Sequence, residues 1–282
     1  MPARSIAHLV PAIDTQDGAG VRLRRALGAR PGERLDPLLM LDAFSSDNPG
    51  DYIAGFPAHP HRGFETVTYI LDGHMLHEDH LGNRGDLTAG GVQWMTAGRG
   101  IIHSEMPQQT AGRLRGFQLW LNLPAREKLK PAGYRDIPAA EIPVVTGADG
   151  TVVKVIAGHY RHVDGETAGP IAGGATAPIY LDVALPAGGA CDIPLPASHN
   201  VLLYCFEGAL QLDGVDVPAA TTAVLGAGDT LALTAPRGPG RCLVIGGRPL
   251  NEPVVQYGPF VMNTREEIEQ AVRDYQAGRL TG

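Results

Sequence analysis

The alternation of apolar and polar residues predicts a chain built from short β-strands. Seven segments are rich in β-branched or aromatic residues and have Gly, Pro, Asn or Asp close by. They are Glu65–Leu71, Val92–Met95, Phe117–Leu121, Val152–Ile156, Ile179–Val183, Val201–Phe206 and Cys242–Ile245. The 37 glycines and 23 prolines, spread along 282 residues, supply turns between such strands. We therefore expect an all-β protein of the sandwich or barrel type and not a helical bundle.

One helix is predicted, close to the end of the chain, at about Arg265 to Ala277. Thr264 can cap its start, Glu267 completes a capping box, and Gly278 ends it. Its apolar stripe consists of Ile268, Val272 and Tyr275. We interpret this helix as a packing element.

Two stretches in the first half of the chain recur in the second half. Glu65–Gly73 resembles Asn200–Gly208, with a tyrosine and a closing acidic-Gly turn in matching places. Gly90–Gly100 lines up with Gly228–Gly238 through shared Gly, Thr-Ala and Arg-Gly positions. Two copies of one β fold are the simplest explanation.

The two copies are expected to form two domains, which suits the length of the chain. The join should lie between Pro124 and about Gly150, where prolines interrupt the apolar periodicity. We place the domains at residues 1–137 and 138–282.

Charge and hydropathy exclude several classes of partner. The 23 Lys and Arg against 30 Asp and Glu give a net charge of −7, so no overall positive field attracts nucleic acid. No apolar run approaches the ~18 to 20 residues of a membrane span, and residues 1–20 lack a secretory signal. We expect a cytoplasmic protein, with a nuclear location left open for a eukaryotic source.

The three cysteines fit that location. Cys191, Cys205 and Cys242 contain no C-x-x-C pair, and the latter two lie inside apolar strand-like runs. An odd number of thiols in this pattern indicates buried, reduced cysteines in a reducing compartment.

The residues that carry chemistry form two pairs. His59 and His61, and His103 and Glu105, are each spaced i and i+2, which places both side chains of a pair on one face of an extended strand. The segment between the pairs is long enough to bring them opposite each other. Imidazole suits first-row metals such as Fe, Zn, Cu and Ni, and a carboxylate adds an anionic oxygen. Four such ligands on an octahedral ion leave two open positions, as a reactive site requires.

Other polar residues near these pairs compete for roles. Glu65 follows His61 by four residues and, on one alternating strand, would share its face, either as a ligand in place of Glu105 or as a carboxylate beside the ligands. His74, His77 and His80 follow the Asp72-Gly73 turn beside acidic residues, and a solvated hairpin tip explains them better than a second metal site.

The second copy serves as an internal control for the metal hypothesis. In our alignment Arg241, Cys242 and Leu243 fall near His103, Ser104 and Glu105, and Pro194 and Pro196 fall opposite His59 and His61, while His199 lines up with Phe64. The second copy keeps the strand pattern without the ligands, so the fold alone does not explain the histidines of the first copy.

Long blocks of the sequence closely resemble the signature blocks of the pirins, a branch of the cupin superfamily. The blocks are Leu39–Asp42, Gly55–Tyr69, Gly91–Pro107 and Gln118–Pro124, with looser similarity through Gln256–Phe260 and the final helix. The resemblance implies two tandem cupin β-barrels, a jelly-roll-like bicupin, with an iron-type metal in the first barrel only. His59, His61, His103 and Glu105 match the pirin ligands, and Glu65 is then assigned to a place beside them.

The resemblance also implies an activity. Pirins are similar in their site to cupin dioxygenases that cleave flavonols, so we hypothesise a quercetin 2,3-dioxygenase-like enzyme that uses O2, a small aromatic substrate and Fe(II), with Cu, Ni, Mn or Zn as alternatives. Glu105 would be both a ligand and a candidate base for the substrate hydroxyl. Phe64, Trp94 and Met95 are candidates to line the pocket, with a core role expected for at least one of them.

Two alternatives stay open at this point. Other pirins are described as regulators, so the protein could instead be a non-catalytic redox sensor that binds a transcription factor or a metabolic enzyme through its iron site. A cupin isomerase or another metal enzyme is a third hypothesis, because the fold does not determine the substrate. The resemblance favours a monomer.

Overall fold

The computed structural model describes residues 2–30 and 32–282, and the chain divides into two compact units. The first unit contains Asp14–Arg25, Leu38–Ala139 and Leu250–Gly282. The second contains the chain up to Ile13, Ala26–Pro37 and Ala140–Pro249. The expected ranges 1–137 and 138–282 are contiguous, whereas each unit takes in segments from both halves of the chain.

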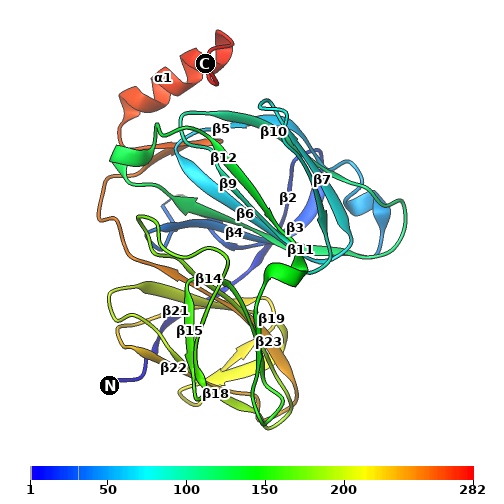
Figure 1. The fold of residues 1–282 in the computed structure, drawn as a ribbon, viewed down its shortest axis with the longest axis vertical. Coiled ribbons are helices and arrows are strands. Elements are labelled where there is room, and N and C mark those ends of the chain that lie inside the picture. Colours follow the sequence, from blue (N-terminus) through cyan, green and yellow to red (C-terminus); the bar gives the residue numbers. More distant parts are fainter. Residues whose placement is uncertain (1, 31) are drawn as a thin grey trace. The chain divides into compact units, whose positions relative to one another are not determined.

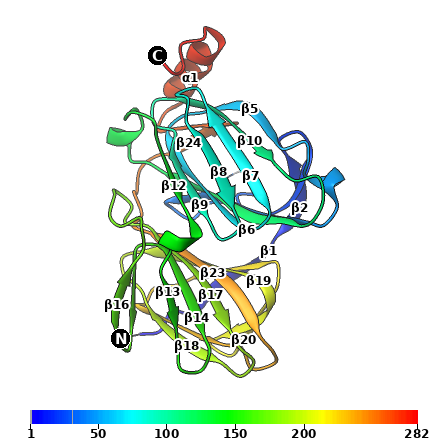
Figure 2. The same ribbon diagram turned by 45° about the vertical axis from the view of Figure 1, so that its right-hand side comes forward.

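Two sheets form the body of the first unit, one of seven strands in the order β12-β9-β6-β11-β4-β3-β2 and one of four in the order β5-β10-β7-β8 (Figures 1 and 2). Their strands are β2 (Ile13–Asp17), β3 (Val21–Leu27), β4 (Leu38–Ser46), β5 (Phe56–His61), β6 (Phe64–Asp72), β7 (His74–Asp79), β8 (Arg84–Thr88), β9 (Val92–Thr96), β10 (Ile101–Pro107), β11 (Leu114–Asn122) and β12 (Gly133–Ile137). Short 3-10 turns lie at η1 (Pro49–Asp51), η2 (Ala125–Glu127) and η3 (Ala139–Glu141).

The chain passes back and forth between these two sheets. It leaves the four-stranded sheet after β5, crosses to β6 through Gly63, and returns to β7 through Gly73. Both glycines have positive φ, +92° and +101°, a conformation that side chains rarely adopt. A Cβ on Gly63 would also run into the carbonyl oxygen of Val261. This glycine therefore sets the crossing that follows His61.

The second unit is one large sheet in the order β1-β21-β19-β23-β17-β14-β13, to which β18, β20 and β22 are also paired, plus a β15-β16 hairpin. Its strands are β1 (Ile6–Pro11), β13 (Val144–Thr146), β14 (Val152–Ala157), β15 (His159–His162), β16 (Gly165–Ala168), β17 (Ile179–Leu185), β18 (Ala190–Pro194), β19 (Asn200–Leu212), β20 (Val215–Pro218), β21 (Thr221–Leu225), β22 (Thr230–Thr234) and β23 (Gly240–Gly247). An apolar core of Val, Leu and Ile side chains fills it, and Cys205 and Cys242 are part of that core.

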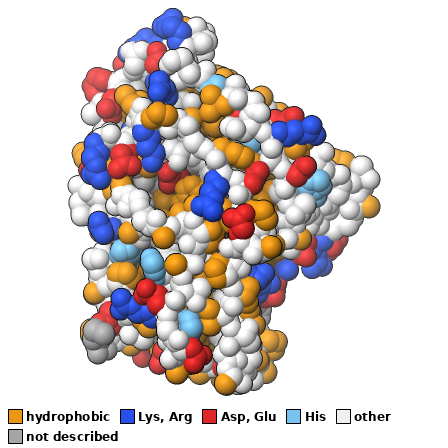
Figure 3. Space-filling view, in the orientation of Figure 1, with side chains coloured by type: hydrophobic (Ala, Val, Ile, Leu, Met, Phe, Trp, Pro, Cys, Tyr) orange, Lys and Arg blue, Asp and Glu red, His pale blue; other side chains and the backbone are white. Residues whose placement is uncertain are grey.

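These elements confirm the all-β prediction. The seven expected strand segments lie within β6, β9, β11, β14, β17, β19 and β23. Within the described residues, no helix has the length and apolar character that a bilayer crossing requires. On the face drawn in Figure 3, basic and acidic side chains are interspersed.

The end of the chain packs on the first unit as β24 (Val255–Tyr257), β25 (Phe260–Met262) and α1 (Arg265–Gln276). Thr264 and Glu267 form the predicted capping box, and Gly278 follows the helix with φ +67°. Ile268 and Ala271 of α1 are buried in a cluster with β25. The predicted helix, its caps and its packing role are confirmed, but Tyr275 of the predicted apolar stripe is exposed.

Strand pairing supports one half of the repeat alignment and corrects the other. β6 pairs with β9 and β11, and β19 pairs with β21 and β23, so Glu65–Gly73 and Asn200–Gly208 are equivalent. Strand pairing likewise makes β9 the counterpart of β21, since β9 pairs with β6 and β21 pairs with β19. β5 precedes β6 as β18 precedes β19. Because β10 pairs with β5 and β22 pairs with β18, β10 corresponds to β22. Our alignment of β9 with β22 was therefore wrong by one strand.

The correction changes which residues match the histidines. The Gly-rich turns that precede β9 and β22 are similar in sequence, which explains the wrong match between these two strands. Arg241–Leu243 belong to β23, which is the counterpart of β11. The positions on β18 and β22 that face each other in the second unit are Cys191 with Leu233 and Ile193 with Leu231. These side chains pack in or against the apolar core of that unit.

Candidate metal centre

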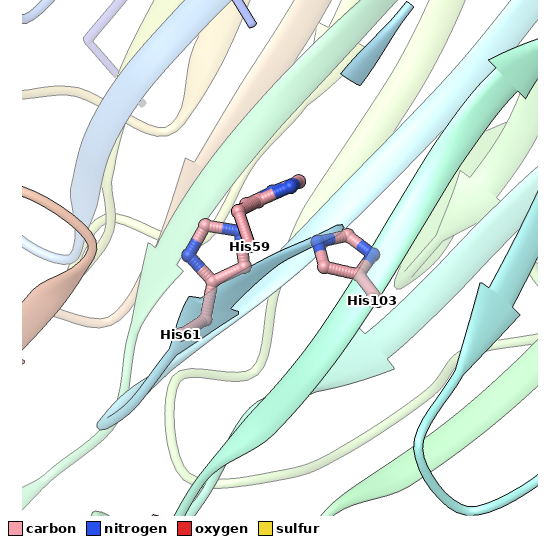
Figure 4. Close-up of side chains that lie close together, drawn as sticks. All are labelled: His59, His61 and His103. Carbon is pink, nitrogen blue, oxygen red and sulfur yellow. The ribbon is translucent and has the colours of Figure 1, made fainter. Parts of the chain in front are cut away.

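Strands β5 and β10 bring three of the predicted ligands together. The strands are antiparallel neighbours, with His103 opposite His59 and Ile101 opposite His61. One ring nitrogen from each of His59, His61 and His103 lies within 4.8 Å of the other two. Figure 4 shows the three rings pointing toward one another from the two strands. The side chains of these three residues therefore converge, as their i, i+2 spacing predicted.

Burial keeps two of these rings in the neutral state that binds metal. His61 and His103 are each 2% exposed. Burial lowers the pKa of His61 well below its ordinary value, the neighbouring His59 lowers it further, and the backbone of Pro259 acts in the opposite direction. Burial also lowers the pKa of His103 well below its ordinary value, with smaller effects from His61, His59 and His77.

The same two rings have buried nitrogens with no hydrogen-bond partner among the described residues. They are Nδ1 and Nε2 of His61 and Nε2 of His103. A buried polar atom without a partner costs free energy, on the order of 1–3 kcal/mol. A neutral imidazole has a hydrogen on one nitrogen and a lone pair on the other. A coordinated cation would therefore satisfy one nitrogen of His61 and Nε2 of His103, and the donor set fits a metal ion.

His59 lies at the more accessible side of the cluster, and its ring orientation is fixed by the backbone. Its Nδ1 is 2.7 Å from the carbonyl oxygen of Pro57. Because a carbonyl only accepts, Nδ1 carries the hydrogen and Nε2 keeps the lone pair. His59 therefore presents Nε2 as its ligand atom.

Glu105 is buried nearby but is held by hydrogen bonds and is not part of the group of three. Its Oε1 accepts from Thr68 Oγ1 at 2.8 Å, and its Oε2 accepts from Gln118 Nε2 at 2.8 Å. The pairing of β10 with β5 shifts register between His103 and Glu105. Each carboxylate oxygen retains a further lone pair. Glu105 stays a predicted ligand.

Glu65 does not share a strand with His61. The Gly63 turn separates them, since β5 ends at His61 and β6 begins at Phe64. The Glu65 carboxylate accepts hydrogen bonds from Trp94 Nε1 at 3.1 Å, Thr96 Oγ1 at 2.7 Å and Lys130 Nζ at 3.3 Å. The expectation that one alternating strand carries both residues was wrong.

Aromatic rings cover one side of His61. The ring centroids of Phe64 and Trp120 lie 5.1 Å and 5.2 Å from that of His61, both in edge-on contacts. Among the candidates for pocket lining, Phe64 thus contacts the cluster, whereas Met95 packs in a core group with Ala97 and Ile101. Trp120 was not singled out from the sequence, although the strand that carries it was predicted.

The C-terminal segment anchors the backbone next to His61. The Arg62 guanidinium donates to the carbonyl oxygens of Arg99 and Leu280 and pairs with Asp274 of α1 at 2.8 Å. The Arg62 backbone exchanges hydrogen bonds with Pro259 and Val261. The end of the chain therefore fixes the strand end that bears His61.

Of the three histidines after the Asp72-Gly73 turn, His77 is not part of a solvated tip. His77 is 1% exposed, and its Nδ1 lies 3.3 Å from Nδ1 of His103. His74 is half-buried and pairs with Asp86, while His80 is exposed. The hairpin interpretation failed for His77 because β7 is an interior neighbour of β10 in the four-stranded sheet. Strand alternation from His77 to Asp79 was the signal that could have found it.

The geometry defines the class of protein. Two cupin domains, with convergent imidazoles on neighbouring strands of the first, make the chain a bicupin with a candidate metal centre. The family described as Pirin matches residues 20–121, and the Pirin C-terminal cupin domain matches residues 180–281. The chain belongs to the pirin family.

Individual relatives are similar to this protein over nearly its whole length. A Pseudomonas aeruginosa protein that bears the provisional name quercetin 2,3-dioxygenase is 55% identical over 98% of both chains. A pirin-like protein of Caulobacter vibrioides is 49% identical over 99% of this chain and 100% of its own. The crystal structure of quercetin 2,3-dioxygenase from Acinetobacter baumannii superposes with a TM-score of 0.90 at 33% identity, covering 99% of both chains.

Proposed function

We propose that this pirin is a metal-dependent dioxygenase that cleaves flavonols with O2, as a quercetin 2,3-dioxygenase does. The convergence of three imidazoles, two of them buried with unpartnered nitrogens, carries the proposal. The quercetin 2,3-dioxygenase names of the similar proteins support the substrate class.

The residues that would hold the metal are His59, His61, His103 and Glu105. Three neutral imidazoles and one carboxylate suit a divalent first-row ion, with Fe(II) as our first choice over Cu, Ni, Mn and Zn. When bound, such an ion supplies Lewis-acid stabilisation of a developing negative charge on the substrate oxygen and an open position for O2. Of these four residues, only Glu105 would contribute a negative charge to the site.

Glu105 is our candidate for the base that accepts the proton of the flavonol 3-hydroxyl. Thr68 and Gln118 each donate to one of its oxygens at 2.8 Å, which orients the carboxylate. Gln118 also accepts from Trp120 Nε1 at 3.3 Å, so the aromatic wall and the carboxylate are held together. Phe64 and Trp120 exclude water from their side of His61.

To test the proposal, metal content and quercetin turnover are measured in the same sample. The purified protein is stripped with excess chelator and then reloaded with Fe(II), and quercetin loss and O2 consumption are recorded at each stage. We expect turnover to disappear on stripping and to return on reloading. His61→Ala should abolish both metal retention and turnover, whereas His8→Ala, at an exposed histidine of the second unit, should change neither.

Two results would count against the proposal. Quercetin turnover that is indifferent to chelator and to His61→Ala would remove the metal from the reaction. Stoichiometric Fe binding without consumption of O2 or flavonol would instead favour the redox regulator, whose own signature is partner binding that differs between the ferric and ferrous protein.

A further inference from the structure

Strand β7 brings two buried polar residues beside His103. In the β10–β7 pairing, Asp79 lies opposite His103 and His77 lies opposite Glu105. The side chains of His77 and Asp79 are 1% and 0% exposed. Nδ1 of His77 is 3.3 Å from Nδ1 of His103, and Nε2 of His77 is 3.5 Å from Oδ2 of Asp79. The three groups form a line that ends at the candidate metal centre.

Asp79 determines the direction of the hydrogen bonds along this line. Its Oδ1 accepts from the backbone N–H groups of Leu81 and Asn83, and its Oδ2 accepts from Asn83 Nδ2 at 2.8 Å. These donors and His77 outweigh the effect of burial and lower the pKa of Asp79. A carboxylate ringed by donors can only accept, so the His77 nitrogen that faces it carries a hydrogen.

The hydrogen on His77 Nε2 determines which ring nitrogen of His103 carries a hydrogen. With Nε2 protonated, the neutral His77 ring has its lone pair on Nδ1 and accepts the N–H of His103 Nδ1. His103 then has its remaining lone pair on Nε2, the buried nitrogen without a hydrogen-bond partner. That nitrogen is the atom available to a metal shared with His59 and His61.

Tyr134 keeps the His77 ring in place. The two rings are stacked, with centroids 4.6 Å apart and planes inclined by 25°. The Tyr134 hydroxyl donates to Asp136 and accepts from Gln93 Nε2 at 3.1 Å. A ring that is packed on its face and hydrogen-bonded at both nitrogens has little freedom to turn.

We propose that His77 and Asp79 are positioning residues, which hold His103 as the Nδ1–H tautomer so that Nε2 faces the metal. The inference rests on the metal centre of the proposed function and extends it to two residues that do not bind the ion. Outer hydrogen-bond partners of metal-binding histidines typically change metal affinity by about 10- to 100-fold when they are removed.

The variants reverse, remove or restore the hydrogen bonds that join Asp79, His77 and His103. Asp79→Asn can donate its amide to His77 Nε2, which would move the His77 hydrogen to Nδ1 and the His103 hydrogen to Nε2. His77→Phe keeps a flat ring without an acceptor, and His77→Gln restores an acceptor for His103. Asp86→Asn is the matched control, because Asp86 pairs with His74 at 3.0 Å on the same sheet but at an exposed position.

The readout is Co2+ affinity of the stripped protein, measured by competition with a chelator, together with the Co2+ absorption spectrum. We expect Asp79→Asn and His77→Phe to weaken Co2+ binding by about 10- to 100-fold, while His77→Gln stays close to wild type and Asp86→Asn is unchanged. Equal affinities for wild type, Asp79→Asn and His77→Phe would overturn the inference. Loss of Co2+ binding in His61→Ala but not in these variants would overturn it without touching the proposed centre.

A second measurement does not depend on any variant folding. The 15N chemical shifts of the histidine rings in the stripped wild-type protein distinguish the two neutral tautomers. We expect His103 and His59 as Nδ1–H and His77 as Nε2–H. A protonated Nε2 on His103 would refute the inference, whereas failure of the wild-type protein to bind Co2+ at all would instead refute the metal centre.

Discussion

Lys128 donates a hydrogen bond from its buried ammonium group to the carbonyl oxygen of Gly63, at 2.8 Å. The same nitrogen donates to Asn122 Oδ1 at 2.7 Å and to the carbonyl oxygen of Val261 at 2.9 Å. The Lys128 residue is 1% exposed. One side chain therefore joins the β5–β6 crossing, the end of β11 and the C-terminal strand β25.

Replacing Lys128 should loosen this junction. Lys128→Met keeps the length of the side chain but leaves three buried oxygens without their donor, and we expect the free energy of unfolding to fall by about 2–4 kcal/mol. Urea titration measures the change. Lys154→Met, at a partly exposed lysine of the second unit, should cost under about 1 kcal/mol. A Lys128→Met protein as stable as wild type would show that the junction contributes nothing.

The stability contribution of Lys128 should also depend on pH. Burial lowers the pKa of Lys128 from 10.5 to about 8, against the opposing effects of Glu252 and Glu267. Between these two values the unfolded chain binds the proton more tightly than the folded protein does, so stability rises with pH in this window. Lys128→Met lacks this titration. The stability difference between wild type and the variant should therefore grow in favour of wild type from about pH 8 to about pH 10, and a constant difference would contradict the low pKa.

The fold was largely predictable because its signals are local. Short β-branched runs between turn residues identified strands such as β6 and β19, and the Thr264–Glu267 capping box identified α1. The equivalence of β10 and β22 was not predictable in this way. It depends on which strands pair across the sheets, and similar Gly-rich turns placed β9 against β22 instead.

The candidate site shows the same limit. His59, His61 and His103 were predicted because their spacing acts within single strands, and strand alternation is a local property. The shared strand of His61 and Glu65 was wrongly predicted because of the turn at Gly63, and the exposure of His77 was wrongly predicted because β7 pairs with β10. The pairing of β7 with β10 joins residues far apart in sequence, so the pattern near His77 carries little trace of it. Gly63, in contrast, is a local turn signal between His61 and Glu65.

The three cysteines should differ in reactivity between the folded and unfolded protein. Cys205 and Cys242 are fully buried free thiols, and burial raises the pKa of Cys205 to about 11 and that of Cys242 well above its ordinary value. Because the thiolate is the reactive form, neither should react with a thiol reagent in the folded state. Cys191 is half-buried and should react slowly. We expect at most one thiol to react in native protein and three in denaturant, and Cys191→Ser should remove the native reaction. Rapid reaction of all three would contradict the buried positions.

The hydrogen bond from Thr68 to Glu105 offers a test of whether Glu105 takes part in metal binding. Thr68→Val removes the hydroxyl that donates to Oε1 at 2.8 Å and preserves the shape of the side chain, so Gln118 alone orients the carboxylate. We expect the variant to lose about 1.5–3 kcal/mol of stability, as for other hydrogen bonds to charged groups, and to bind Co2+ about 10-fold more weakly. Thr66→Val, two residues earlier on β6 and also buried, is the isosteric control for the cost of the substitution itself. If Thr68→Val and Glu105→Gln both left Co2+ affinity at the wild-type value, Glu105 would not be a ligand, and the three histidines would form the whole protein contribution to the centre.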